Sequence, residues 1–150
     1  TTETYTPSRN AARPSGRVRN RGIAWATTAD LLERLDDSLT GPPEVAVILI
    51  GTNDLEFGVA HAQTVRNTCL ILDRISAVAP ATRVVLQAVL PRSDRYNTLV
   101  APPTTALARV CGERDIERLA LTVQFSGAEN SLETATTCDR LHPTGAGPPR

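Results

Sequence analysis

The chain has 150 residues, of which 41% are hydrophobic and 21% charged, and its 16 basic and 16 acidic residues leave a formal net charge of zero. This length and composition are typical of one globular domain and exclude a disordered chain. The balanced charge gives no sign of a nucleic-acid partner, which usually shows as clustered basic residues, and the longest apolar run, residues 45–50, is far too short to span a membrane.

Residues 1–16 are polar and have no apolar periodicity. We predict an irregular segment there and a domain over residues 17–150. The first residues also lack the apolar stretch of a secretory signal peptide, and the cellular compartment stays open. The cysteines, Cys69, Cys111 and Cys138, have no CxxC spacing, which speaks against a zinc site. A single disulfide among them stays open.

The apolar pattern predicts strands that alternate with helices. A short strand is expected at residues 17–20. Thr27 and Asp30 have the spacing of a capping box, which satisfies free N–H groups at the start of a helix, and that helix is expected to reach about Leu39. The further expected elements are a strand at 45–50, a helix at 61–78, a strand at 84–90, a helix at 106–119 and a strand at 121–125.

The strand at residues 45–50 is a continuous apolar and largely β-branched run, which is typical of a parallel strand buried on both faces. Strands that alternate with helices predict an open parallel α/β sheet with helices on both faces. In such sheets, functional sites form beyond the carboxyl ends of the strands. The segments that follow a strand are therefore the places to look for chemistry.

Asp139 and His142 form the first candidate pair. Histidine titrates near neutral pH and suits general acid–base work, and a carboxylate bonded to one ring nitrogen fixes its tautomer and orientation. The same residues can also be a plain helix start, with Asp139 as the N-cap and Pro143 in the first turn. The pair alone leaves both interpretations open.

The segment Gly-Thr-Asn-Asp at residues 51–54 is the second candidate. It directly follows the apolar strand, which predicts a tight turn with small polar groups at the sheet edge. The side-chain amide of Asn53 could donate to a developing oxyanion there. An ordinary turn held by the Asn and Asp side chains would explain the same residues.

Six segments together carry a more specific pattern. They are Asn-Arg-Gly-Ile at 20–23, the two threonines at 27–28, the helical segment at 32–36, Ile-Leu-Ile-Gly-Thr-Asn-Asp-Leu at 48–55, the strand and its Pro-Arg end at 84–92, and Asp-Arg-Leu-His-Pro at 139–143. In order and spacing, from about residue 17 to 147, they resemble the SGNH hydrolase superfamily. The nearest branch is that of GDSL esterases and lipases and the platelet-activating-factor acetylhydrolases.

The resemblance implies a flavodoxin-like three-layer α/β/α sandwich around a parallel sheet, and hydrolysis of esters through an acyl-enzyme. It implies that His142 is the general base, Asp139 the carboxylate that orients it, and Asn53 a donor of the oxyanion hole. The substrate would be a small-molecule ester. No metal or organic cofactor is implied, and the oligomeric state stays open.

The oxyanion hole departs from the family's pattern at one position. The family has a glycine whose backbone N–H completes the hole, and Trp25 stands in its place, followed by Ala26 instead of Asp. The backbone N–H of Trp25 is the expected second donor. Glycine, however, adopts conformations and permits close approaches that tryptophan does not.

The nucleophilic serine is the second departure. The family's Gly-Asp-Ser motif follows a buried first strand, and its position here falls at or before Thr1. We therefore expect a sheet without its first strand and a domain truncated at both ends. Ser8 is the nearest candidate in chain order, but no apolar strand precedes it. Ser38 lies at a helix end, and Ser93 follows a strand where the family has no nucleophile.

Three functions remain to be weighed. The first is ester hydrolysis by a Ser-His-Asp type mechanism with an unidentified serine. The alternative is a catalytically inactive SGNH-like domain that binds an ester, a glycan or a protein. A flavodoxin-like nucleotide binder comes last, because no Gly-rich phosphate loop follows a strand.

Overall fold

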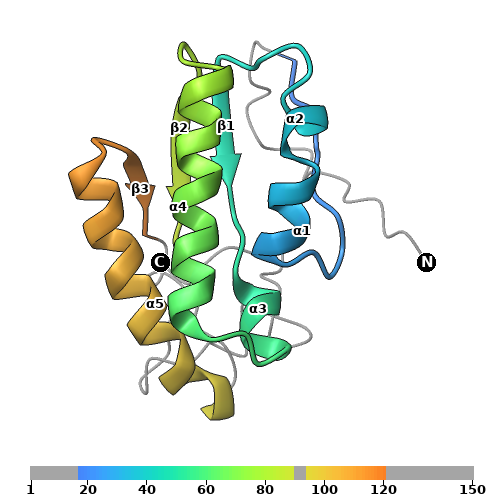
Figure 1. Ribbon diagram of the computed structural model, residues 1–150. Helices are drawn as coiled ribbons and strands as arrows, with labels where there is room; N and C mark the ends of the chain where they lie inside the picture. Colours follow the sequence, from blue (N-terminus) through green and yellow to red (C-terminus); the bar gives the residue numbers. More distant parts are fainter. Residues whose placement is uncertain (1–16, 90–93, 121–150) are drawn as a thin grey trace, which may run out of the picture.

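The computed structural model describes residues 17–89 and 94–120. Its elements, in chain order, are α1 (Thr28–Glu33), α2 (Leu35–Ser38), β1 (Val45–Ile48), α3 (Thr52–Glu56), α4 (His61–Val78), β2 (Arg83–Gln87), α5 (Asp94–Glu113) and β3 (Glu117–Leu119). The strands of this described part form one parallel sheet in the order β1-β2-β3 (Figure 1). The predicted α/β architecture is confirmed.

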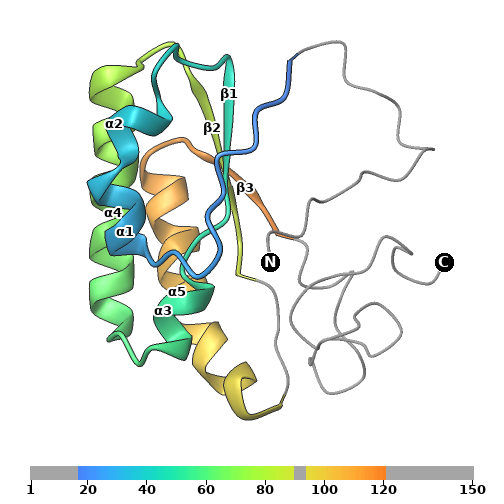
Figure 2. The ribbon, with the colours of Figure 1, turned by 90° about the vertical axis from the view of Figure 1, so that its right-hand side faces the viewer.

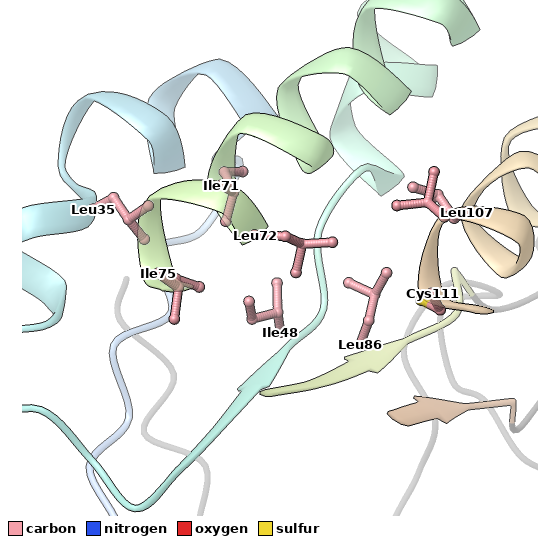
Figure 3. Close-up of a cluster of buried hydrophobic side chains, with 9 residues drawn as sticks. Leu35, Ile48, Ile71, Leu72, Ile75, Leu86, Leu107 and Cys111 are labelled. Atoms are coloured by element: carbon pink, nitrogen blue, oxygen red, sulfur yellow. The ribbon is translucent and has the colours of Figure 1, made fainter. Parts of the chain in front are cut away.

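The hydrophobic core lies between this sheet and α4. Ile71, Leu72 and Ile75 on α4 are at most 1% exposed, and they pack with Ile48 of β1 and Leu86 of β2 (Figure 3). Burying a side chain of this size contributes roughly 1.5–3 kcal/mol. The predicted helix at residues 61–78 is confirmed, because its apolar positions recur at the helical period that this packing requires.

Only one face of the sheet carries the helices of the described part (Figure 2). On β1, Val45 and Val47 are 46% and 63% exposed, whereas Ile48 points to the helices and is buried. Successive residues of a strand point to opposite faces, which produces this alternation. The prediction that residues 45–50 are buried on both faces is therefore wrong for the described structure, and the strand itself ends at Ile48.

The capping box at the start of α1 is confirmed. The Thr27 backbone N–H donates to the Asp30 carboxylate at 2.8 Å, and the Asp30 backbone N–H donates to the Thr27 hydroxyl at 3.3 Å. The predicted single helix to Leu39 is wrong in one respect, because helical geometry is interrupted at Arg34 before α2 begins. The predicted strand at 17–20 is also wrong, since no described strand pairs with these exposed residues.

The last described helix differs from its prediction at both ends. α5 starts at Asp94, not near residue 106, and continues through two prolines, of which Pro103 is fully buried. It stops before residue 119 because Asp115 has a left-handed backbone, with φ of 52°, and the Ile116 N–H donates to the Cys111 carbonyl at 2.9 Å. This is a Schellman closure, which frees the next residues for β3.

Several expectations fall outside the described residues, among them the strand at 121–125 and the Pro-Arg end of the strand at 84–90. None of the described helices is both long and apolar enough to cross a membrane.

Candidate active site

The carboxyl end of β1 leads directly into α3 through Gly51. This residue has φ of 104°, which L-amino acids rarely adopt, and a Cβ added there would lie 3.3 Å from Cγ2 of Thr64. The positive φ favours glycine at this position, and the close approach to Thr64 adds to that preference. The predicted turn at residues 51–54 is therefore limited to Gly51. The three residues after it form the first turn of α3.

Asn53 lies in this first turn with its side chain partly buried. Its Nδ2 donates to the backbone carbonyl of Ala26 at 2.9 Å. This bond decides which end of the amide faces the neighbouring loop, and it uses one of the two N–H groups of the amide. No other acceptor among the described residues takes the second N–H.

The loop that Asn53 contacts is a tight turn at residues 23–26. The Ala26 N–H donates to the Ile23 carbonyl at 3.3 Å, and Trp25 has φ of 66°. Ala24 is not among the residues with positive φ. A positive φ at the third residue alone is the mark of a type II turn, where glycine is preferred. Trp25 therefore occupies a position with the backbone geometry of a glycine.

The indole of Trp25 gains little from folding, since the residue is 68% exposed. Its backbone N–H has no acceptor among the described residues. The N–H of Trp25 and the amide of Asn53 are thus two donors on adjoining segments, joined through Ala26. Figure 1 shows the start of α1 and α3 side by side at the same end of the fold.

A buried polar cluster lies directly behind these two donors. The Asp54 carboxylate is 1% exposed and accepts the backbone N–H of Thr28 at 2.9 Å, the Thr28 hydroxyl, and the Thr64 hydroxyl at 3.3 Å. The Asn67 side chain donates to the Thr28 hydroxyl at 3.0 Å. We call Thr28, Asp54, Thr64 and Asn67 the Asp54 cluster. It connects α1, α3 and α4.

Asp30 and Cys111 are among the ionisable groups outside this cluster whose pKa values are shifted. The backbone N–H of Thr27 stabilises the ionised Asp30, and the pKa of Asp30 is lowered from its ordinary value of 3.8. The Cys111 thiol lies in the core, and this burial raises its pKa. A buried thiol of this kind is inert. Neither group contacts Asn53 or Trp25.

One shallow hollow on the described surface lies away from these donors. It has a volume of about 470 Å³ and is lined by residues at the amino ends of β2 and β3, including Arg83 and Glu117, which form an ion pair. Sites in parallel α/β sheets form at the opposite, carboxyl ends. Among the described residues, no three His, Cys, Asp or Glu side chains gather to hold a metal.

The sequence model of the GDSL-like Lipase/Acylhydrolase family matches residues 1–148. The chain belongs to this family. Membership confirms the predicted resemblance.

Solved structures of GDSL-like hydrolases have the same fold. One from Streptococcus pneumonia, described as a platelet activating factor, is 25% identical over 87% of this chain and 66% of its own, with a TM-score of 0.73. A GDSL-like lipase from Bacteroides thetaiotaomicron VPI-5482 is 23% identical, with coverages of 83% and 66% and a TM-score of 0.68. The psychrotrophic esterase EstA from Pseudoalteromonas sp. is 19% identical, with coverages of 85% and 67% and a TM-score of 0.62.

The chain spans about two thirds of the length of these structures. A comparison with curated protein sequences finds no match. The family is described as one of lipases and acylhydrolases, which supports ester hydrolysis in general.

The structure places only part of the expected GDSL-like site. It brings Asn53 and the turn of Trp25 together, as the sequence predicts for two donors of one hole. Asp139, His142 and Ser8 lie outside the described residues, and their expected roles stay predictions.

Sequence reasoning missed the role of Asp54 and its partners. Its signal was present in α4, where Thr64, Asn67 and Thr68 interrupt an otherwise apolar helix face at spacings of three and four. A polar stripe on a buried face needs hydrogen-bond partners from another element, because an unpaired polar group in the interior is costly.

Proposed function

We propose that this GDSL-like chain hydrolyses small acyl esters through a Ser-His-Asp mechanism. The observation that carries the proposal is the pair of donors at the carboxyl end of β1. The Asn53 amide and the Trp25 backbone N–H lie on segments joined by a 2.9 Å hydrogen bond, at the edge where parallel sheets build their sites. Two fixed donors are what an oxyanion hole requires.

The proposed roles follow from the resemblance to the family. A serine attacks the ester carbonyl while His142 takes its proton, and Asp139 stabilises the imidazolium that forms. The negative charge then develops on the carbonyl oxygen, where Asn53 and Trp25 donate to it. Collapse of the intermediate releases the alcohol, with the proton returned by His142, and water then repeats the sequence on the acyl-enzyme. Ser8 is the nearest candidate for the nucleophile in chain order.

The proposed substrate class, small acyl esters, follows from the resemblance to GDSL-type esterases. The hole is bordered by Trp25, which leaves most of its indole in solvent, and by α3, whose Asp54 and Leu55 are buried.

The test is labelling of the whole chain with a fluorophosphonate, mapped by mass spectrometry. A serine triad attacks phosphorus and displaces fluoride, which leaves a stable adduct on the nucleophile. The Pseudoalteromonas relative is described as inhibited by monoethylphosphonate, a related phosphorus group. We expect one labelled serine, and no label in His142→Ala.

The alternative is an inactive member of the family that binds an ester, a glycan or a protein. Trp25 in the position of a glycine favours it, because a strained turn can hold the N–H less accurately than a relaxed one. A folded chain that takes no label, and hydrolyses no short-chain nitrophenyl ester, would establish this alternative and overturn the enzyme.

A further inference from the structure

Asp54 is a buried carboxylate without a cationic partner among the described residues. Its two oxygens accept from the Thr28 N–H, the Thr28 hydroxyl and the Thr64 hydroxyl, all of which are neutral donors. Desolvating a carboxylate costs several kcal/mol, and a well-packed apolar side chain is often as good or better for stability. A buried carboxylate therefore needs its hydrogen bonds, and those of Asp54 join α1, α3 and α4.

The contacts of Asp54 have a specific geometry relative to the donors. Asn53 and Asp54 are consecutive residues of α3, and they bond Ala26 of the preceding turn and Thr28, the first residue of α1. These two bonds are made by the residues before and after Thr27, so they fix both the position and the rotation of this segment against α3. Trp25 directly precedes Ala26 in the same turn.

We propose that Asp54 is a positioning residue that holds the Trp25 N–H and the Asn53 amide as one rigid unit. The inference rests on the proposed function, since it gives these two donors the task of binding an oxyanion. Thr64 extends the same anchor to α4, the best-packed helix of the described structure. Pre-organised donors need supporting hydrogen bonds of this kind, because a shift of about 1 Å can cost roughly 100-fold in rate.

The chain offers matched variants for the test. Asp54→Asn keeps the size of the side chain and removes an acceptor. Thr64→Val removes only the hydroxyl that α4 contributes. Thr68→Val is the control, because Thr68 is equally buried one turn further along α4 and bonds only the Thr64 carbonyl, at 2.8 Å.

The first readout does not depend on activity. Trp25 is the sole tryptophan, so the decay of its fluorescence anisotropy reports the motion of the turn at residues 23–26. We expect faster local motion in Asp54→Asn and in Thr64→Val, with the far-UV circular dichroism unchanged, and wild-type behaviour in Thr68→Val. If Asp54→Asn does not fold, Thr64→Val carries the test alone.

The second readout is steady-state hydrolysis of a short-chain nitrophenyl ester by the same variants. We expect kcat to fall roughly 10- to 100-fold in Asp54→Asn, with KM changed by less than about two-fold, because only the transition state carries the oxyanion.

Each failure has its own signature. Unchanged anisotropy in the folded Asp54→Asn and Thr64→Val chains overturns the positioning role, whatever the activity. An inactive wild-type chain overturns the proposed function, and the anisotropy still decides whether Asp54 holds the turn.

Discussion

The left-handed backbone of Trp25 costs free energy that a single substitution should remove. Its φ of 66° lies in the left-handed region, which costs an L-amino acid roughly 1–2 kcal/mol. Glycine escapes this cost but loses about 0.5–1 kcal/mol more backbone entropy on folding than alanine does. Trp25→Gly should therefore be more stable than Trp25→Ala by about 0.5–1 kcal/mol. Both variants remove the same indole, so their difference isolates the backbone.

The assay is urea denaturation of the whole chain followed by far-UV circular dichroism, because both variants lack the only tryptophan. Ala24→Gly is the control in the same turn. Ala24 is not among the residues with positive φ, so glycine there should destabilise the chain by roughly 0.4–1 kcal/mol. If Trp25→Gly proves less stable than Trp25→Ala, the turn is not strained and our reading of it as a glycine position is wrong.

Two further predictions concern the core and the first helix. Leu72→Ala should lower the free energy of unfolding by about 2–5 kcal/mol, because this side chain is buried in the core. Leu70→Ala, on the same helix but 52% exposed, should change it by less than about 0.5 kcal/mol. Equal effects of the two substitutions in urea denaturation would contradict the packing of α4. The folded pKa of Asp30 is lowered by the Thr27 N–H, so its stabilisation is fully present above 3.8 and is lost as the pH falls through the lower folded value. The stability difference between wild type and Asp30→Asn, measured by thermal unfolding, should shrink below pH 3.8, and a constant difference would refute the capping contribution.

Local patterns in the sequence predict the elements whose cause is local. The helix at 61–78 follows from apolar residues at the helical period, and the start of α1 follows from the spacing of Thr27 and Asp30. Both depend on contacts within a few residues. The parallel sheet follows from the alternation of strands with helices, which leaves few other ways to pair the strands.

The failed predictions depend on contacts between distant segments. Residues 17–20 have a strand-like sequence but no described strand to pair with. The start of α5 cannot be read from its prolines, because burial of Pro103 in the fold decides whether a helix tolerates them. Burial of β1 on both faces cannot be read either, because it depends on which helices cover the sheet.

For the candidate site, the sequence by itself determined the family, the chemical types of the residues, and the place of Asn53 after a buried strand. It marked Trp25 as the unusual residue of the expected oxyanion hole. Only the tertiary structure decided that Trp25 adopts a glycine conformation, that Asn53 bonds Ala26, and that Asp54 lies buried behind both. The physical reason is that these bonds join residues 26 or 27 positions apart, and no pattern local to either segment encodes how closely the two will approach.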